Sequence, residues 1–326
     1  MKKILFILLS VMLMLSSSGC TPQSVSGDHY ALDTIISITL YNTQDSSILQ
    51  QCWDRVDALE ALLSRTRPGS DIYRINHAGG KPVTVTDETV HLLRLAMDIA
   101  KASEGALDVS IGPVTELWDF KAASPTLPDN TDLAAAVSHV NYQKISIDGN
   151  VVTLPASMAL DLGAIAKGYI ADQLIAILEQ TDCTCALLNL GGNVLTYGSK
   201  KDGSPWSIGI RDPQGSASQA LLSLSFDGTQ SVVTSGVYER GFDLNGIRYH
   251  HLIDPATGMP VDNDLISVSI VSPSSALADG LSTACFVLGV NKGIALLEEY
   301  ENTEGLFLMK DGTQKMTSGF KTLIRP

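Results

Sequence analysis

Residues 161–172 read Asp-Leu-Gly-Ala-Ile-Ala-Lys-Gly-Tyr-Ile-Ala-Asp, a glycine-containing turn that leads into a helical pattern. We expect a strand before this stretch and a helix after it. Backbone N–H groups at a helix start favour a phosphate group, and Lys167 on the first turn could reach the same anion. The alternative is an ordinary helix start, in which Asp161 bonds the first-turn amides and Lys167 lies in solvent.

The N-terminus has the pattern of an export signal. Residues 1–3 carry two lysines, residues 4–15 are apolar, and residues 16–19 are small and lead into Cys20. This pattern resembles a bacterial lipoprotein signal, in which the cysteine becomes the acylated first residue, although Ser17 stands where a large aliphatic residue is usual. We therefore expect a protein outside the cytoplasm, anchored to the bacterial membrane by a lipid.

The remaining chain is acidic and has few cysteines. We expect a signal peptide over residues 1–19, a tether over 20–29 and one folded domain over 30–326. The whole chain has a formal charge of −13, and loss of Lys2 and Lys3 leaves 20 basic and 35 acidic residues, or −15. We do not expect nucleic acid as a partner, because both it and the protein are negatively charged. The other cysteines lack metal-site spacing, and we expect them in the core: Cys52, Cys183, Cys185 and Cys285.

Helical and strand patterns are mixed along the chain without regular alternation. This favours an α+β fold over a doubly wound parallel sheet. Helices are expected at about 49–63, 87–103, 165–178, 275–288 and 291–300. Strands are expected at 30–41, 151–160, 186–190, 206–210, 221–226, 231–234, 248–253, 265–271, 305–308 and 319–324.

A second stretch suited to chemistry lies in residues 276–286. On a helix Asp279 and Thr283 stand one turn apart on the same face, with Ser282 beside them. A carboxylate and hydroxyls suit a hard cation such as Mg²⁺. The alternative is that Thr283 bonds the carbonyl one turn back and Asp279 faces solvent.

A third stretch contains adjacent histidines, His250 and His251. Successive strand residues point to opposite faces, so at most one of them lines a given pocket. A neutral imidazole near Asp254 could act as a general base. The alternative is a half-buried packing residue.

Five motifs in this order resemble the ApbE family, the FAD:protein FMN transferases. They are Asp161 to Tyr169 (DLGAIAKGY), Leu188 to Asn193 (LNLGGN), Thr234 to Arg240 (TSGVYER), His251 to Gly258 (HLIDPATG) and Ala278 to Thr283 (ADGLST). The resemblance extends to Leu63 to Arg65 and to Gly105 to Pro113, and so covers nearly the whole mature chain. The chain departs from the family at Ala31 to Thr34, where Met-Gly-Thr is usual, at Val237 and at Gly280.

The resemblance implies a T-fold-like α+β core, with mixed sheets and packed helices, that binds FAD and Mg²⁺. It implies attachment of FMN through a phosphoester to a threonine or serine of a partner protein, with release of AMP. The partner would be an extracytoplasmic flavoprotein with a Ser/Thr-Gly-Ala-Ser/Thr type motif, such as Nqr or Rnf redox subunits. With water as acceptor, the same site would be a Mg²⁺-dependent FAD pyrophosphatase. With an unreactive flavin it would be a flavin-binding lipoprotein.

The family's functional residues carry over onto three sets of positions. The histidine that would deprotonate the acceptor hydroxyl is His251. The metal ligands are Asp279, Ser282, Thr283 and the backbone carbonyl of Ala164. The flavin and adenine contacts are Leu32, Thr66, Ala106, Leu107, Asp108, Asp161, Lys167 and Ile253.

Overall fold

The computed structural model describes residues 24–120, 122, 124–213, 215 and 219–325. The expected signal peptide and Cys20 lie outside these residues. An antiparallel sheet of eight strands forms the centre of the molecule, in the order β1-β2-β6-β7-β10-β13-β14-β15. Its strands are β1 (Ser24–Ala31), β2 (Thr34–Tyr41), β6 (Cys185–Leu190), β7 (Asn193–Tyr197), β10 (Gln230–Gly236), β13 (Leu265–Ser272), β14 (Glu304–Met309) and β15 (Gln314–Met316).

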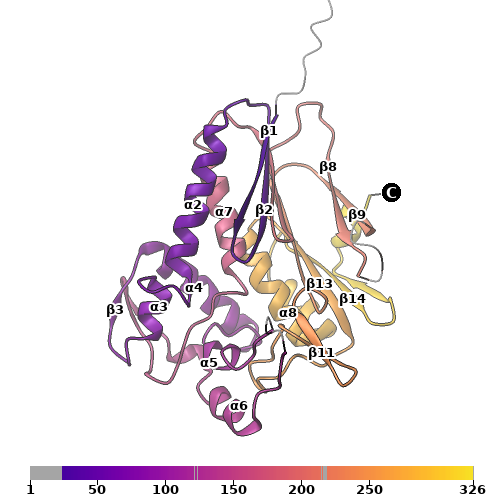
Figure 1. Cartoon of the computed structure of the whole chain (residues 1–326). Helices are drawn as coiled ribbons and strands as arrows, with labels where there is room; N and C mark the ends of the chain where they lie inside the picture. The colour runs from indigo at the N-terminus through magenta and orange to yellow at the C-terminus, as the bar shows by residue number, and fades with distance from the viewer. Residues whose placement is uncertain (1–23, 121, 123, 214, 216–218, 326) are drawn as a thin grey trace, which may run out of the picture.

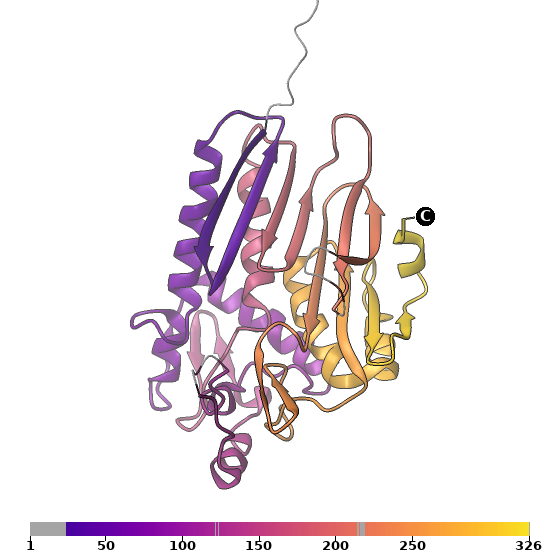
Figure 2. The same ribbon diagram turned by 45° about the vertical axis from the view of Figure 1, so that its right-hand side comes forward.

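Helices pack along one face of this sheet (Figures 1 and 2). The main core lies between the two layers, because α2, α4, α7 and α8 turn apolar sides to the sheet or to a neighbouring helix. The helices are α2 (Ser47–Leu63), α3 (Asp71–Asn76), α4 (Asp87–Ala102), α5 (Gly112–Thr115), α6 (Asn130–Val137), α7 (Ala166–Leu178) and α8 (Ser275–Leu297), with short 3₁₀ turns η1 (Tyr142–Lys144) and η2 (Phe320–Leu323). These layers confirm the expected α+β class.

Three small sheets surround the central one. The hairpin of β8 (Trp206–Arg211) and β9 (Ala220–Phe226) encloses a second core against the opposite face, around Trp206, Leu224 and Val232. The other two pair β3 (Val83–Thr84) and β4 (Ser146–Asp148) with β5 (Val151–Thr153), and β11 (Gly241–Leu244) with β12 (Ile247–His250).

Several expected elements differ from the structure at the N-terminus. The single strand over 30–41 is a hairpin of β1 and β2, whose turn residues Leu32 and Asp33 have φ of 55° and 60°. Strand β1 begins at Ser24, so most of the expected tether over 20–29 is part of the sheet. The hairpin could not be predicted from the local sequence, because Leu-Asp is not a usual residue pair at turn positions that need a left-handed backbone.

Other differences lie later in the chain. The strand expected over 151–160 is only β5, and the strand expected over 319–324 is a 3₁₀ turn. Strands β11 and β15 were not expected. The two helices expected over 275–288 and 291–300 are joined as α8, with a non-helical Gly289 (φ 75°) between them. Helix α8 is long and apolar enough to resemble a membrane span, but it lies in the core against α7, β10 and β13.

Helices α7 and α8 cap each other. Asp172 on α7 accepts hydrogen bonds from Ser275 N (2.8 Å) and Ala276 N (2.9 Å) at the start of α8. Asp279 on α8 accepts one from Gly168 N (2.9 Å) at the start of α7. Each carboxylate therefore satisfies free amides and opposes the positive end of the neighbouring helix.

Close contact between these helices depends on Gly168. A Cβ atom there would lie 2.2 Å from the carbonyl oxygen of Ser275. We expect Gly168→Ala to lower the free energy of unfolding by at least about 2 kcal/mol, because backbone atoms cannot yield as a flexible side chain does. Urea denaturation would measure the change. Gly27→Ala is the control, since its new Cβ would lie 3.4 Å from Leu49, an ordinary contact. Equal midpoints for both variants would contradict the prediction.

Candidate active site at the end of the sheet

A cavity of about 1190 Å³ lies at the end of the central sheet. The turns of the β1–β2 and β6–β7 hairpins form part of its wall. Segments far apart in the sequence form the rest, from the loop after α2, the start of α7, strand β8, the end of β10 and helix α8. Binding sites in proteins are concave in this way and combine apolar walls with a few polar groups.

The cavity brings together twelve of the thirteen residues selected from the sequence. They are Leu32, Thr66, Ala106, Leu107, Asp108, Asp161, Ala164, Lys167, His251, Ile253, Asp279 and Thr283. Ser282 is fully buried and does not line the cavity. Its hydroxyl donates to the carbonyl of Asp279 (2.9 Å) and lies 2.7 Å from Ser235 Oγ.

Asp279 faces the cavity and the start of α7, not solvent. Its side chain is 5% exposed, and its Oδ1 lies 3.5 Å from the ammonium of Lys167. Thr283 Oγ1 lies 3.4 Å from Ser235 Oγ. The alternative of a solvent-facing carboxylate is therefore wrong, and so is that of a Lys167 side chain free in solvent.

These oxygens have the character of a hard-cation site. Asp279 supplies a carboxylate and Thr283 a hydroxyl, and Ala164 lines the same cavity. Within the described residues no group of three or more His, Cys, Asp or Glu side chains is placed to share a metal ion. The donor set fits Mg²⁺, which proteins bind through one or two carboxylates together with substrate phosphates.

Asp161 joins three segments of the cavity wall. Its Oδ1 accepts from Gly163 N (2.9 Å), and its Oδ2 accepts from Thr115 Oγ1 (2.8 Å) and lies 3.3 Å from Arg65 Nε. The alternative in which Asp161 bonds the first-turn amides of α7 is thus wrong, since the helix begins at Ala166. The carboxylate instead fixes Arg65 at the cavity.

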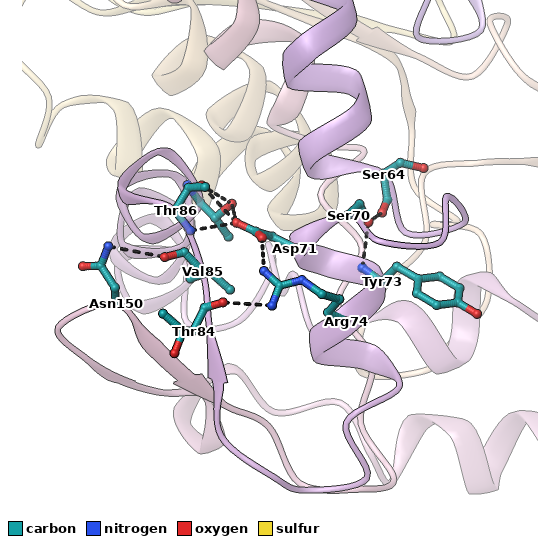
Figure 3. Close-up of polar contacts among 10 residues, drawn as sticks. Ser64, Ser70, Asp71, Tyr73, Arg74, Thr84, Val85, Thr86 and Asn150 are labelled. Carbon is teal, nitrogen blue, oxygen red and sulfur yellow. Dashed lines mark hydrogen bonds and ion pairs between the residues drawn. The ribbon is translucent and has the colours of Figure 1, made fainter.

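A polar network holds the loop that carries Arg65 and Thr66 (Figure 3). Ser70 Oγ donates to the Ser64 carbonyl at one end of the loop, and Ser64 Oγ accepts from Thr66 N (3.2 Å). Buried Asp71 then ties α3 to the start of α4, accepting from Thr86 N (2.8 Å) and pairing with Arg74. Hydrogen bonds within the loop and at the starts of α3 and α4 therefore hold the loop in place.

Asp108 is buried, and its carboxylate oxygens bond protein groups. Oδ1 accepts from Ser110 N (2.8 Å) and Ser110 Oγ (2.6 Å), and Oδ2 accepts from Tyr142 N (2.8 Å). Burial raises the pKa of this carboxyl group, while these hydrogen bonds oppose the rise. These hydrogen bonds hold this part of the cavity wall to Ser110 and Tyr142.

The two histidines point in different directions, as expected. Strand β12 ends at His250, which is 5% exposed and packs edge-on against Phe286. His251 follows the strand, lines the cavity, and has its Nδ1 3.2 Å from the carbonyl oxygen of Arg240. A carbonyl can only accept, so Nδ1 carries the proton and Nε2 is the free base. Burial lowers the pKa of His251 to about 4, which leaves the ring neutral at pH 7.

His250 should make the protein sensitive to acid. Burial lowers its pKa to about 4 from an ordinary 6.5, so the unfolded chain binds more protons between these pH values. Stability should fall as pH drops from about 6.5 to about 4, with a contribution from His250 of roughly 3 kcal/mol. His250→Gln should lessen this slope in thermal melts at pH 7, 5.5 and 4.5. The same substitution at the exposed His91 is the control. A slope unchanged by His250→Gln would contradict the assignment.

The sequence did not single out several lining residues. Trp118 and Phe120 stack at 5.4 Å with parallel rings, and Trp118 Nε1 donates to the Gly258 carbonyl (2.8 Å). The only signal was an apolar irregular segment, too long for an ordinary connection. Asn193 also lines the cavity, and its motif had no assigned role.

The comparisons with known proteins agree with this geometry. Residues 32–307 match the ApbE family. The chain is 36% identical to the FAD:protein FMN transferase of Treponema pallidum (strain Nichols) over 315 residues, which are 90% of this chain and 87% of the relative. It is 38% identical to one of Klebsiella pneumoniae (strain 342) over 280 residues, 85% and 86% of the two chains.

Solved structures show the same fold. The crystal structure of the ApbE protein from Thermotoga maritima has a TM-score of 0.86 at 28% identity, covering 93% of this chain and all of that one. The flavinyl transferase ApbE of Pseudomonas stutzeri, in its apo form, has a TM-score of 0.82 at 28% identity, covering 93% and 97%. The ordered motifs, the antiparallel sheet with its helical layer and these matches show that the chain belongs to the ApbE family.

Proposed function

We propose that this protein transfers FMN from FAD to a threonine or serine hydroxyl of an extracytoplasmic flavoprotein, in a Mg²⁺-dependent reaction that releases AMP. One observation carries the proposal: a neutral histidine and an Asp-Thr-Lys group line the same cavity. The names of the relatives, FAD:protein FMN transferase, support it.

Each residue has a defined part in this reaction. The acceptor oxygen attacks the FMN phosphorus, its proton passes to Nε2 of His251, and the bond to the AMP phosphate oxygen breaks. Asp279, Thr283 and the Ala164 carbonyl would hold Mg²⁺, which neutralises pyrophosphate charge when bound. Lys167 places a fixed positive charge beside the same atoms, and Ser235 and Ser282 support Thr283 from behind. Positioning and charge stabilisation then account for most of the rate.

Incubation with an acceptor domain would test the reaction. Purified protein, FAD, Mg²⁺ and a domain with a Ser/Thr-Gly-Ala-Ser/Thr motif, such as an Nqr or Rnf redox subunit, should give a fluorescent acceptor band in a denaturing gel. The acceptor mass should rise by one FMN, with an equal amount of AMP. Free FMN beside unlabelled acceptors would instead identify an FAD pyrophosphatase. Intact, stoichiometrically bound FAD would identify a flavin-binding protein.

The proposal includes attachment to the membrane. The small residues before Cys20 support cleavage and acylation at this cysteine. Mass spectrometry of the mature N-terminus should find a lipidated Cys20. An unmodified chain that begins elsewhere would refute the anchor without affecting the proposed chemistry.

A further inference from the structure

Two buried side-chain nitrogens in the described part of the chain have no hydrogen-bond partner, Asn193 Nδ2 and His250 Nδ1. His250 lies in the core beside Phe286, whereas Asn193 is 3% exposed and lines the cavity. Native proteins rarely leave a buried donor unpaired, because the donor then loses its hydrogen bonds to water and gains none in the protein. The Asn193 amide is therefore a donor whose partner we expect inside the cavity.

The turn before Asn193 holds this side chain in place. Gly191 and Gly192 have φ of 60° and 99°, and Gly192 N donates to Asn189 Oδ1 (2.9 Å). A Cβ atom at Gly191 would lie 2.5 Å from Thr34 Oγ1, so the β6–β7 turn packs directly on the β1–β2 hairpin. These contacts fix the backbone of Asn193 at the first position of β7, so the residue is preorganised before a ligand binds.

Strand pairing places Asn193 near the Thr283 hydroxyl. Val194 stands opposite Val232, so the antiparallel register puts Asn193 opposite Val233 and diagonal to Ser235. Leu195 and Val233 belong to the core on the helical face, and alternation along the strands puts Asn193 and Ser235 on that face too. Ser235 Oγ is 3.4 Å from Thr283 Oγ1. Asn193 therefore stands on the same sheet face as Ser235, beside the part of the cavity that Thr283 shares with Asp279 and Lys167.

We propose that Asn193 Nδ2 donates a hydrogen bond to a phosphate oxygen of the FMN half of FAD. The inference rests on the proposed function, which puts the pyrophosphate beside Asp279, Thr283 and Lys167. An amide N–H₂ group can only donate, and a phosphate oxygen can only accept. Asn193 then holds the group that is transferred, while the AMP half leaves.

Binding of three flavins would test this contact. Titration of FAD, FMN and riboflavin in the presence of Mg²⁺, followed by flavin fluorescence, gives the affinities. We expect Asn193→Ala to weaken FAD and FMN binding by about ten-fold or more and to leave riboflavin binding unchanged, because riboflavin lacks the phosphate. Asn193→Asp should weaken FAD and FMN binding further, since a carboxylate repels phosphate. Equal loss for riboflavin, or no loss for any flavin, would overturn the proposal.

The stability of the ligand-free protein separates this role from a structural one. Removing an unpaired amide should leave the melting temperature of Asn193→Ala unchanged or raised. Thr196→Val in the same strand is the control, since Thr196 Oγ1 lies 2.9 Å from the Gly228 carbonyl and accepts from Gln230 N (3.0 Å). This variant should melt lower and bind FAD normally. A lower melting temperature for Asn193→Ala with unchanged FAD affinity would assign it to structure. Failure of the wild type to bind FAD would refute the proposed function instead.

Discussion

Replacing Asp279 by asparagine should lower FMN transfer by about a thousand-fold in a protein that still folds. The amide oxygen can continue to accept from Gly168 N, so the cap on α7 survives. The negative charge that would hold Mg²⁺ is lost, and groups that stabilise developing charge in a closed site are each worth about 10²–10³ in rate. The labelled acceptor, measured by gel fluorescence against time, reports the change.

The matched control is Asp172→Asn. Asp172 caps α8 as Asp279 caps α7, but it does not line the cavity. The Asp172→Asn variant should have a lower free energy of unfolding than the wild type, but the folded enzyme should transfer FMN at the normal rate. The wild type should also lose activity in EDTA and regain it with Mg²⁺. Full activity of Asp279→Asn, or activity unaffected by EDTA, would rule out the metal site.

The second large effect is expected from His251→Asn. This change removes the base that takes the acceptor proton, and general-base catalysis typically contributes about 10²–10⁴ in rate. FAD affinity should remain, because the asparagine amide can still donate to the Arg240 carbonyl. Single-turnover transfer with saturating FAD separates the chemical step from binding.

His250→Gln is the control for His251. It alters the neighbouring residue, which packs in the core against Phe286 and lies outside the cavity wall. It should change the acid stability and leave transfer at pH 7 nearly intact. If His250→Gln impaired transfer more than His251→Asn, the base would have been assigned to the wrong face of the strand end.

The local sequence was sufficient to predict those parts of the site in which the functional residues are close together in the chain. Asp279 and Thr283 share a helix face because they are four residues apart, and the structure has that face toward the cavity. His250 and His251 point in different directions because successive residues of a strand alternate between its two faces. These relations follow from backbone periodicity and need no knowledge of the tertiary fold.

Relations between distant segments could not be predicted this way. Asp161 meets Thr115 and Arg65, and Asp279 meets Gly168, through packing that no local pattern records. The hairpin at Leu32 was missed because its left-handed residues are held from outside, where Glu60 accepts from Leu32 N (2.8 Å). The unpaired amide of Asn193 likewise becomes visible only when all of its neighbours are known.

The early start of β1 would limit the distance between the cavity and a membrane to which Cys20 was anchored. If a lipid on Cys20 anchors the chain, as proposed, the four steps to Ser24 can reach about 14 Å at most. The eight residues of β1 then add about 27 Å to the turn at Leu32, which lies at the cavity. The cavity can therefore stand no more than about 40 Å from the bilayer surface. The anchored enzyme would then reach acceptor hydroxyls that lie within this distance of the bilayer surface. It would not reach hydroxyls that lie farther from the surface.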